Sequence, residues 1–270
     1  MLSINSGSVT SVFHLNGCLP PLDHVAPRRE GFAQVYEQEL QKEAVGADSK
    51  QGYQVIFYGD SITETWKGTD MGRECPRCAG VPDVLDKHFG MYTTGIYAVG
   101  GDQVDHLMYR LQHRELLKRH PPKVSVLLIG TNDLGAASCF PGGGAPITRA
   151  ANATAQRILE MLEYMRANNP KTEIVLLSLL PRGGQTDQTW WDWPNRFSKA
   201  IEIINAHQKN FAKTMEGVHY VDCTAPFLPN GKLDENLMPD ALHPNAEGMD
   251  LFAACFAEDV HHYMGRATSF

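Results

Sequence analysis

From residue 53 onward, the chain alternates between short apolar runs and longer stretches whose apolar residues recur every three or four positions. Short apolar runs are typical of buried strands, and the longer periodicity is typical of helices with one apolar face. The runs occupy residues 53–58, 92–99, 123–130, 173–180 and 217–222. Strands that alternate with helices form a parallel sheet covered on both faces. We therefore predict an α/β fold, a three-layer, doubly wound (flavodoxin-like) parallel sheet of five strands.

The first fifty residues lie outside this pattern. Residues 1–28 are rich in proline, glycine and serine and resemble an extended lead-in, whereas the apolar spacing over 29–46 predicts one helix. The rest of the chain shows neither an internal repeat nor a second series of alternating strands and helices. We predict an N-terminal extension with one helix over residues 1–50 and a single α/β domain over residues 51–270.

Charge and hydrophobicity limit the partners of this chain. It has 24 lysines and arginines against 31 acidic residues, a net charge of −7, and no basic cluster, which argues against nucleic acid as a partner. The longest apolar runs, such as 174–180, are far shorter than the ~18 residues that cross a bilayer, so we expect no membrane span. No signal-peptide pattern stands at the start. The compartment stays undetermined between the cytoplasm, which is slightly favoured, and secretion as a mature form.

The six cysteines are too sparse for a disulfide framework. Cys75 and Cys78 form the one close pair. We favour plain structural cysteines here, with a small disulfide or a redox motif as alternatives. A zinc site would need a second pair of ligands at matching spacing, and none follows. We predict no metal and no cofactor.

Three loops that follow predicted strands carry residues suited to chemistry, and ligands of such folds lie at the carboxyl ends of the strands. A Gly-Asp-Ser triplet ends at Ser61, which is either part of a helix cap or a nucleophile at a helix N-terminus. A glycine pair ends at Gly101 and either makes a tight turn or presents its N–H to an oxyanion. Asn132 either caps a helix or supplies an amide donor to an oxyanion.

The last candidate loop contains Asp240 and His243, three residues apart in a turn before a predicted helix. This spacing can place a carboxylate beside an imidazole, and a serine nucleophile requires a base oriented in this way. A surface-loop role for the histidine is the alternative. The chain has no G-x-S-x-G elbow, so the ordinary α/β-hydrolase arrangement is not available. Each loop alone favours a structural role, but together they favour a serine esterase.

These four blocks resemble the SGNH (GDSL-type) hydrolase superfamily, whose blocks are Gly-Asp-Ser, a glycine, Gly-x-Asn-Asp and Asp-x-x-His in that chain order. The resemblance implies that Ser61 is the nucleophile and that Asp240 and His243 are the acid and base. It also implies an oxyanion hole formed by Ser61, Gly101 and Asn132.

Within the superfamily, the chain most resembles the catalytic subunits of the intracellular platelet-activating-factor acetylhydrolase. The likeness covers about residues 30–262 and includes Gly-Gly-Asp at 100–102 and Leu-Leu-Pro-Arg-Gly at 179–183. In that branch, apolar residues at the positions of Ile62 and Leu242 line a small acyl pocket. The resemblance also allows a homodimer.

Two segments depart from that branch. Residues 68–80, with the close cysteine pair, look like an insertion. Trp190, Trp191 and Trp193 crowd into the loop after the fourth strand. They either plug the end of the sheet or form an aromatic surface that stacks on sugars or lines an acyl channel.

We therefore predict a serine carboxylic-ester hydrolase that cleaves short-chain acyl esters through an acyl-enzyme. The resemblance implies an acetylesterase-like activity on a small ester, such as an acetylated sugar or lipid. An acyltransferase or a thioesterase with the same triad is one alternative, because nothing in the sequence separates water from an alcohol as acyl acceptor. A catalytically silent binding module is the other.

Overall fold

The computed structural model describes residues 32–142, 144–183 and 190–265, and it confirms the predicted parallel sheet of five strands. The strands lie in the order β4-β1-β5-β6-β7, and all neighbouring pairs are parallel. Their bounds are Val55–Gly59 (β1), Thr94–Ala98 (β4), Val124–Leu128 (β5), Glu173–Leu177 (β6) and Val218–Val221 (β7). Because the strand order reverses at β1, the fold is doubly wound, and a crevice is expected at the carboxyl end of this strand.

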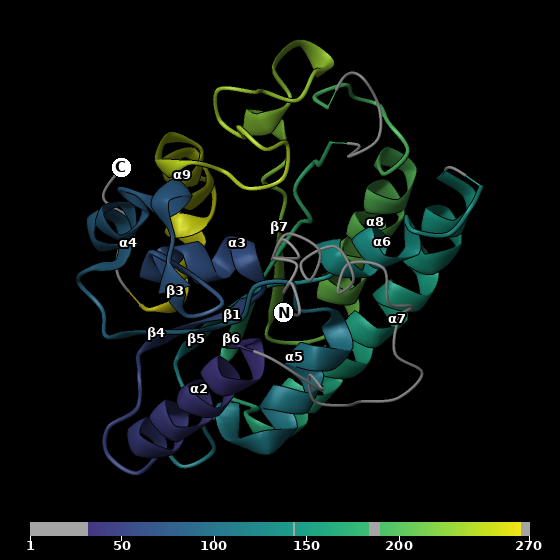
Figure 1. Cartoon of the computed structure of the whole chain (residues 1–270). Helices are drawn as coiled ribbons and strands as arrows, with labels where there is room; N and C mark the ends of the chain where they lie inside the picture. The colour runs from purple at the N-terminus through teal and green to yellow at the C-terminus, as the bar shows by residue number, and fades with distance from the viewer. Residues whose placement is uncertain (1–31, 143, 184–189, 266–270) are drawn as a thin grey trace, which may run out of the picture.

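Helices cover both faces of the sheet (Figure 1). On one face, α4 (Val81–Phe89) packs against α9 (Ala246–Tyr263). On the other, α7 (Gly144–Asn168) packs between α5 (Val104–Arg110) and α8 (Ser198–Thr214). Within the described residues, no helix is long and apolar enough to cross a membrane.

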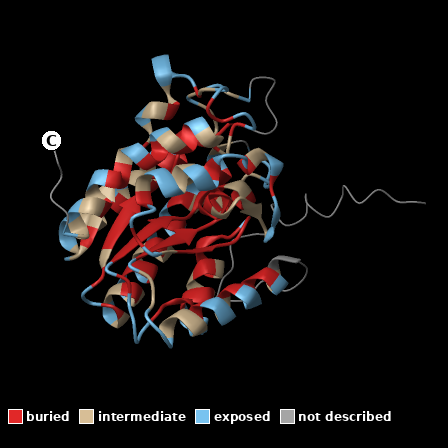
Figure 2. Ribbon diagram, turned by 90° about the vertical axis from the view of Figure 1, so that its left-hand side faces the viewer, coloured by how far each residue is buried: buried red, intermediate tan, exposed pale blue. Residues whose placement is uncertain are grey.

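The core lies along the sheet. All five residues of β1 and of β5 are buried, as expected for strands covered on both faces. Figure 2 shows the buried residues concentrated in the sheet and the exposed residues on the outer sides of the helices. This burial makes β1 a rigid support for the residues that follow it.

The predicted N-terminal helix is present as α2 (Phe32–Asp48). Tyr36, Leu40 and Ala44 recur at helical spacing on its buried side and belong to the main core. The predicted lead-in over residues 1–28 lies outside the described residues, and the domain division at residue 50 stays a prediction.

The segment 68–80 forms a small hairpin that the sequence did not predict. Its strands are β2 (Thr69–Asp70) and β3 (Arg73–Glu74), and a 3₁₀ turn, Pro76–Cys78, follows. This turn brings the Cα atoms of Cys75 and Cys78 to 5.2 Å, a separation suited to a disulfide, and the two cysteines are bridged. The small disulfide, which was an alternative to plain structural cysteines, is therefore the form present. A second disulfide joins Cys223 to Cys255.

Candidate active site

The turn after β1 presents Ser61. β1 ends at Gly59, and Asp60 caps the short helix α3 (Ser61–Glu64) by accepting a hydrogen bond from the N–H of Ile62 at 3.0 Å. Aspartate is favoured at this cap position because its side chain satisfies a free N–H of the first turn. The result is a serine at the carboxyl end of a buried strand, 7% exposed to solvent.

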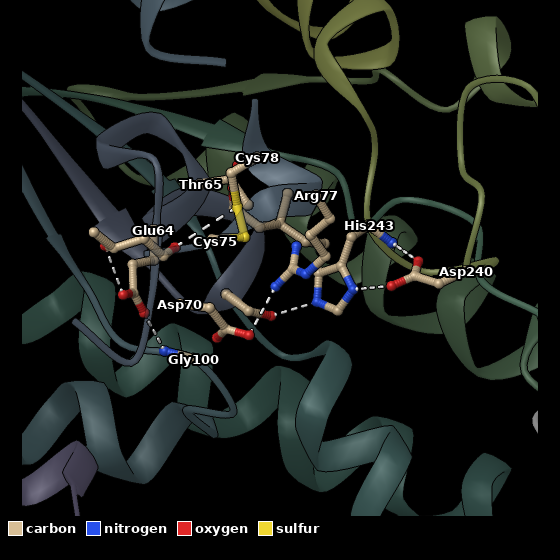
Figure 3. The surroundings of a disulfide bond; sticks show 12 residues. Glu64, Thr65, Asp70, Cys75, Arg77, Cys78, Gly100, Asp240 and His243 are labelled. Carbon is tan, nitrogen blue, oxygen red and sulfur yellow. Dashed lines mark hydrogen bonds and ion pairs between the residues drawn. A yellow bond between two sulfur atoms is a disulfide. The ribbon is translucent and has the colours of Figure 1, made fainter. Parts of the chain in front are cut away.

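The structure brings Ser61, His243 and Asp240 into one hydrogen-bonded chain. Figure 3 shows the His243 ring facing the Asp240 carboxylate. Ser61 Oγ lies 2.8 Å from His243 Nε2, and His243 Nδ1 lies 2.6 Å from Asp240 Oδ2. The other carboxylate oxygen of Asp240 accepts the backbone N–H groups of Leu242 and His243 at 3.0 and 2.7 Å. The aspartate therefore orients the imidazole through both its ring and its backbone.

The carboxyl group of Asp240 is ionised down to strongly acidic pH. Partial burial opposes ionisation, but the hydrogen bonds and charge of His243, with the N–H of Leu242, outweigh it and lower the pKa of Asp240 to about 2. A negative carboxylate therefore faces the imidazole.

Gly101 and Asn132 follow the two strands on either side of β1, because β4 and β5 are its neighbours in the sheet. Gly101 is exposed and has φ +76°, a conformation that residues with a side chain rarely adopt. Asn132 is in the first turn of α6 (Thr131–Ala137), and its Nδ2 donates to the carbonyl of Asp102 at 2.9 Å. An amide nitrogen carries two hydrogens, so the second can serve a ligand.

Glu64 connects the serine helix with both the glycine loop and the hairpin, a role that we did not predict. Its buried carboxylate accepts the N–H groups of Gly100 and Gly72, each at 2.7 Å, and the hydroxyl of Thr69 at 2.9 Å. Burial raises the pKa of Glu64, and these hydrogen bonds partly offset the rise. Its partners are 5 to 36 residues away, so no local motif marks this glutamate.

The hairpin lies against the glycine loop. A Cβ atom on Gly100 would be 2.4 Å from Asp70 Oδ1, so any larger residue would require the Asp70 side chain to shift. Asp70 also pairs with Arg77 at 3.1 Å, and Figure 3 shows the Arg77 side chain extending from the disulfide-bonded turn toward Asp70. The segment that departs from the acetylhydrolase branch therefore lies beside the candidate oxyanion site.

The apolar and aromatic candidates differ in position. Ile62 is 2% exposed and belongs to the core, so it can form at most a pocket floor, whereas Leu242 is half-buried. Trp190 is 44% exposed. Trp191 and Trp193 are half-buried against the core.

Trp191 also lines a surface cavity. Its Nε1 donates to the carbonyl of Met238 at 2.9 Å, which ties the tryptophan loop to the segment that leads to Asp240. The cavity measures about 450 Å³, and its lining is Trp191, Asp192, Pro229, Lys232, Leu233, Asp234, Glu235 and Asn236. Trp191 and Trp193 thus pack against the core, and Trp191 also borders a polar surface cavity; a role of the cluster in binding substrate stays a prediction.

Within the described ranges, no three His, Cys, Asp or Glu side chains are grouped so that they could hold a metal ion.

The parallel sheet, with a serine, a histidine and an aspartate hydrogen-bonded at its carboxyl edge, points to the class of carboxylic ester hydrolases. The comparison with known families agrees. The chain belongs to the GDSL-like lipase/acylhydrolase family, whose model matches residues 57–251, and it is a carboxylic ester hydrolase.

Curated relatives include the alpha1 subunit of platelet-activating factor acetylhydrolase IB from Homo sapiens. It is 25% identical over 199 residues, which is 73% of this chain and 71% of the relative. The alpha2 subunit from Gallus gallus is 25% identical over 190 residues, or 70% and 68% of the two chains. These relatives support the predicted kinship with the acetylhydrolase branch.

Similar solved structures include a GDSL-like lipase from Bacteroides thetaiotaomicron, with a TM-score of 0.59, 22% identity, and coverage of 86% of this chain and 99% of that one. An acetylxylan esterase from Geobacillus stearothermophilus has a TM-score of 0.56 and 17% identity, with coverage of 82% and 98%. At these identities the likeness shows the shared fold alone.

Proposed function

We propose that the protein hydrolyses short-chain carboxylic esters through an acyl-enzyme formed on Ser61. The observation that carries this proposal is the hydrogen-bonded chain from Ser61 through His243 to Asp240, with distances of 2.8 and 2.6 Å. A hydroxyl within hydrogen-bond reach of an imidazole that a carboxylate orients is the arrangement of an activated nucleophile.

The reaction follows from this geometry. Ser61 Oγ attacks the ester carbonyl while its proton passes to His243 Nε2, and Asp240 stabilises the imidazolium that forms. The carbonyl oxygen becomes an oxyanion, which the N–H groups of Ser61 and Gly101 and the amide of Asn132 stabilise. His243 then gives the proton to the leaving alcohol. Water, deprotonated by the same imidazole, releases the acid and restores the serine.

Two observations support a short acyl group. Leu242 is half-buried and directly precedes the proposed base, and the buried side chain of Ile62, next to the proposed nucleophile, leaves it only the role of a pocket floor, so a small acyl pocket bounded by these two branched residues is what we propose. The relatives are named as acetylhydrolase subunits, and one structural neighbour is named as an acetylxylan esterase. We expect kcat/KM to peak at acyl chains of two to four carbons by about tenfold, because a steric misfit costs roughly 1–3 kcal/mol.

Between the two candidate substrates, an acetylated sugar and an acetylated lipid, we favour the sugar. The reason is the cavity beside Trp191, which the hydrogen bond from Trp191 to Met238 joins to the segment that leads to Asp240. Its lining combines an indole ring with carboxylate and amide side chains, which suit the apolar face and the hydroxyls of a sugar. The acyltransferase alternative differs only in the acceptor, and adding a simple alcohol to the assay tests it through the ester product.

The test uses p-nitrophenyl esters from acetyl to palmitoyl, beside acetylated sugars. Ser61→Ala should abolish hydrolysis and leave the thermal midpoint nearly unchanged, whereas Ser49→Ala, at an exposed serine just after α2, should keep full activity. A serine-directed phosphonate should label one site. Labelling mapped to a peptide without Ser61, or hydrolysis retained by Ser61→Ala, would overturn the proposal.

A further inference from the structure

A fully buried arginine lies next to the loop that carries Gly101. Arg110 is the last residue of α5, and its side chain has no exposure to solvent. It donates from Nε to Asp102 Oδ2 at 2.9 Å, and its Nη1 pairs with Glu115. Both carboxylates are also fully buried. One cation therefore faces two carboxylates in the protein interior.

The same guanidinium reaches the ends of two strands. Its Nη2 lies 3.4 Å from the carbonyl oxygen of Gly59, the last residue of β1, and 3.4 Å from that of Tyr97 in β4. Ser61 follows the first of these carbonyls by two residues, and Gly101 follows the second by four. Arg110 thus contacts the backbone from which both residues emerge.

Asp102 connects this buried cluster with both proposed oxyanion donors. It directly follows Gly101, and its carbonyl oxygen accepts the Nδ2 hydrogen bond of Asn132 at 2.9 Å. Gly101 has no side chain that could fix its backbone, so the contacts of Gly100 and Asp102 on either side determine the direction of its N–H. On one side, Glu64 holds the N–H of Gly100, and on the other, Arg110 holds the Asp102 side chain.

Stability gives little reason for such a cluster. Taking charges out of water costs several kcal/mol per ion, and apolar replacements of buried ion pairs are often neutral or stabilising. An oxyanion hole has a different requirement, because its donors must be in place before the negative charge develops. A rigid, multiply bonded guanidinium behind the donor loop meets that requirement.

We infer that Arg110 is a positioning residue for the oxyanion hole and acts through Asp102 on the Gly101 N–H and the Asn132 amide. The inference rests on the proposed function, which assigns these two donors.

The test compares Arg110→Lys with the wild type on p-nitrophenyl acetate, with kcat and KM measured on folded protein. Lysine keeps the charge, but its ammonium cannot reproduce the forked contacts of a guanidinium with Asp102 and Glu115. We expect kcat to fall about 10–100-fold and KM to change less than about threefold, because oxyanion donors act in the transition state.

Arg166→Lys is the matched control. The Arg166 guanidinium also bonds backbone carbonyls, those of Pro170 and Thr172, but it does so before β6, at the opposite end of the strands from Ser61. This variant should keep kcat within about threefold of the wild type.

A double-mutant cycle separates positioning from general damage. In an Asn132→Ala background one donor is already absent, so Arg110→Lys should cost at least about threefold less in kcat than it does in the wild type. Equal losses in both backgrounds would overturn the inference.

The outcomes also distinguish this inference from the proposed function. If Ser61→Ala stays active, the proposed function itself fails. If Ser61→Ala and Asn132→Ala are impaired while folded Arg110→Lys keeps the wild-type kcat, only the inference fails. Should Arg110→Lys not fold, Asp102→Asn replaces it, because asparagine keeps the size and the backbone carbonyl but removes the charge. A wild-type kcat in folded Asp102→Asn refutes the role of this cluster.

Discussion

Replacing Asp60 with asparagine should change how the stability of the fold depends on pH. The Asp60 side chain is fully buried, and its Oδ2 has no hydrogen-bond partner among the described residues. Burial raises the pKa of Asp60 to about 7, although the hydrogen bond from the Ile62 N–H opposes the rise. The carboxylates of Asp102 and Asp133 also contribute to this raised pKa, and the charge of Arg182 opposes it.

The size of the effect follows from that pKa. An unperturbed aspartate has a pKa of 3.8, so between about pH 4 and 7 the unfolded chain releases a proton that the folded chain keeps. Because the pKa of Asp60 is higher in the folded chain, its contribution to the free energy of unfolding is fully present below about pH 4 and is lost as the pH rises to 7. The two pKa values differ by about three units, and at about 1.4 kcal/mol per unit the free energy of unfolding decreases by about 4 kcal/mol over this range.

An asparagine in place of Asp60 does not titrate, and its side-chain oxygen can still cap α3. The unfolding free energy of Asp60→Asn, relative to the wild type, should therefore increase by about 4 kcal/mol between pH 4 and pH 8. Urea unfolding at pH 4, 6 and 8 measures this difference. Asp83→Asn is the control, because it removes an exposed carboxylate in the first turn of α4. A difference between Asp60→Asn and the wild type that is the same at all three pH values would refute the reasoning.

Three further predictions concern activity. Asn132→Ala should lower kcat about 10²–10³-fold with little change in KM. The control Asn168→Ala, which removes an amide that bonds the carbonyl of Tyr164 in its own helix, should keep kcat. A raised KM with intact kcat in Asn132→Ala would instead indicate a role in substrate binding. Leu242→Ala should shift the preferred acyl chain to longer esters, and a wild-type preference for octanoyl or longer would contradict the small pocket. Hydrolysis should be lost in acid, because a general base must be unprotonated to accept the Ser61 proton, while Asp240, with a pKa of about 2, stays ionised. A flat profile of kcat/KM from pH 5 to 9 would contradict the imidazole base.

The sheet and the chain order of the candidate site could be predicted from the sequence because both depend on local patterns. Parallel strands buried on both faces appear as continuous apolar runs, as in β1 and β5. The carboxyl ends of parallel strands meet at one edge of the sheet, so Ser61, Gly101 and Asn132 could be placed at the same edge before any distance was known. Asp240 and His243 are three residues apart, and a single turn brings them together.

The tertiary structure alone decided what supports that site. Glu64 bonds Gly100 across 36 residues, and Arg110 reaches Gly59 across 51. Such pairs have no periodicity, because each contact depends on how separate loops pack and not on the spacing of residues within one element. The hairpin and its disulfide follow the same rule. Two cysteines three apart are compatible with several conformations, and the 3₁₀ turn that follows the hairpin holds their Cα atoms 5.2 Å apart, which suits the bridged one. The sequence therefore determined which groups meet at the sheet edge, whereas long-range packing determined what holds them in place.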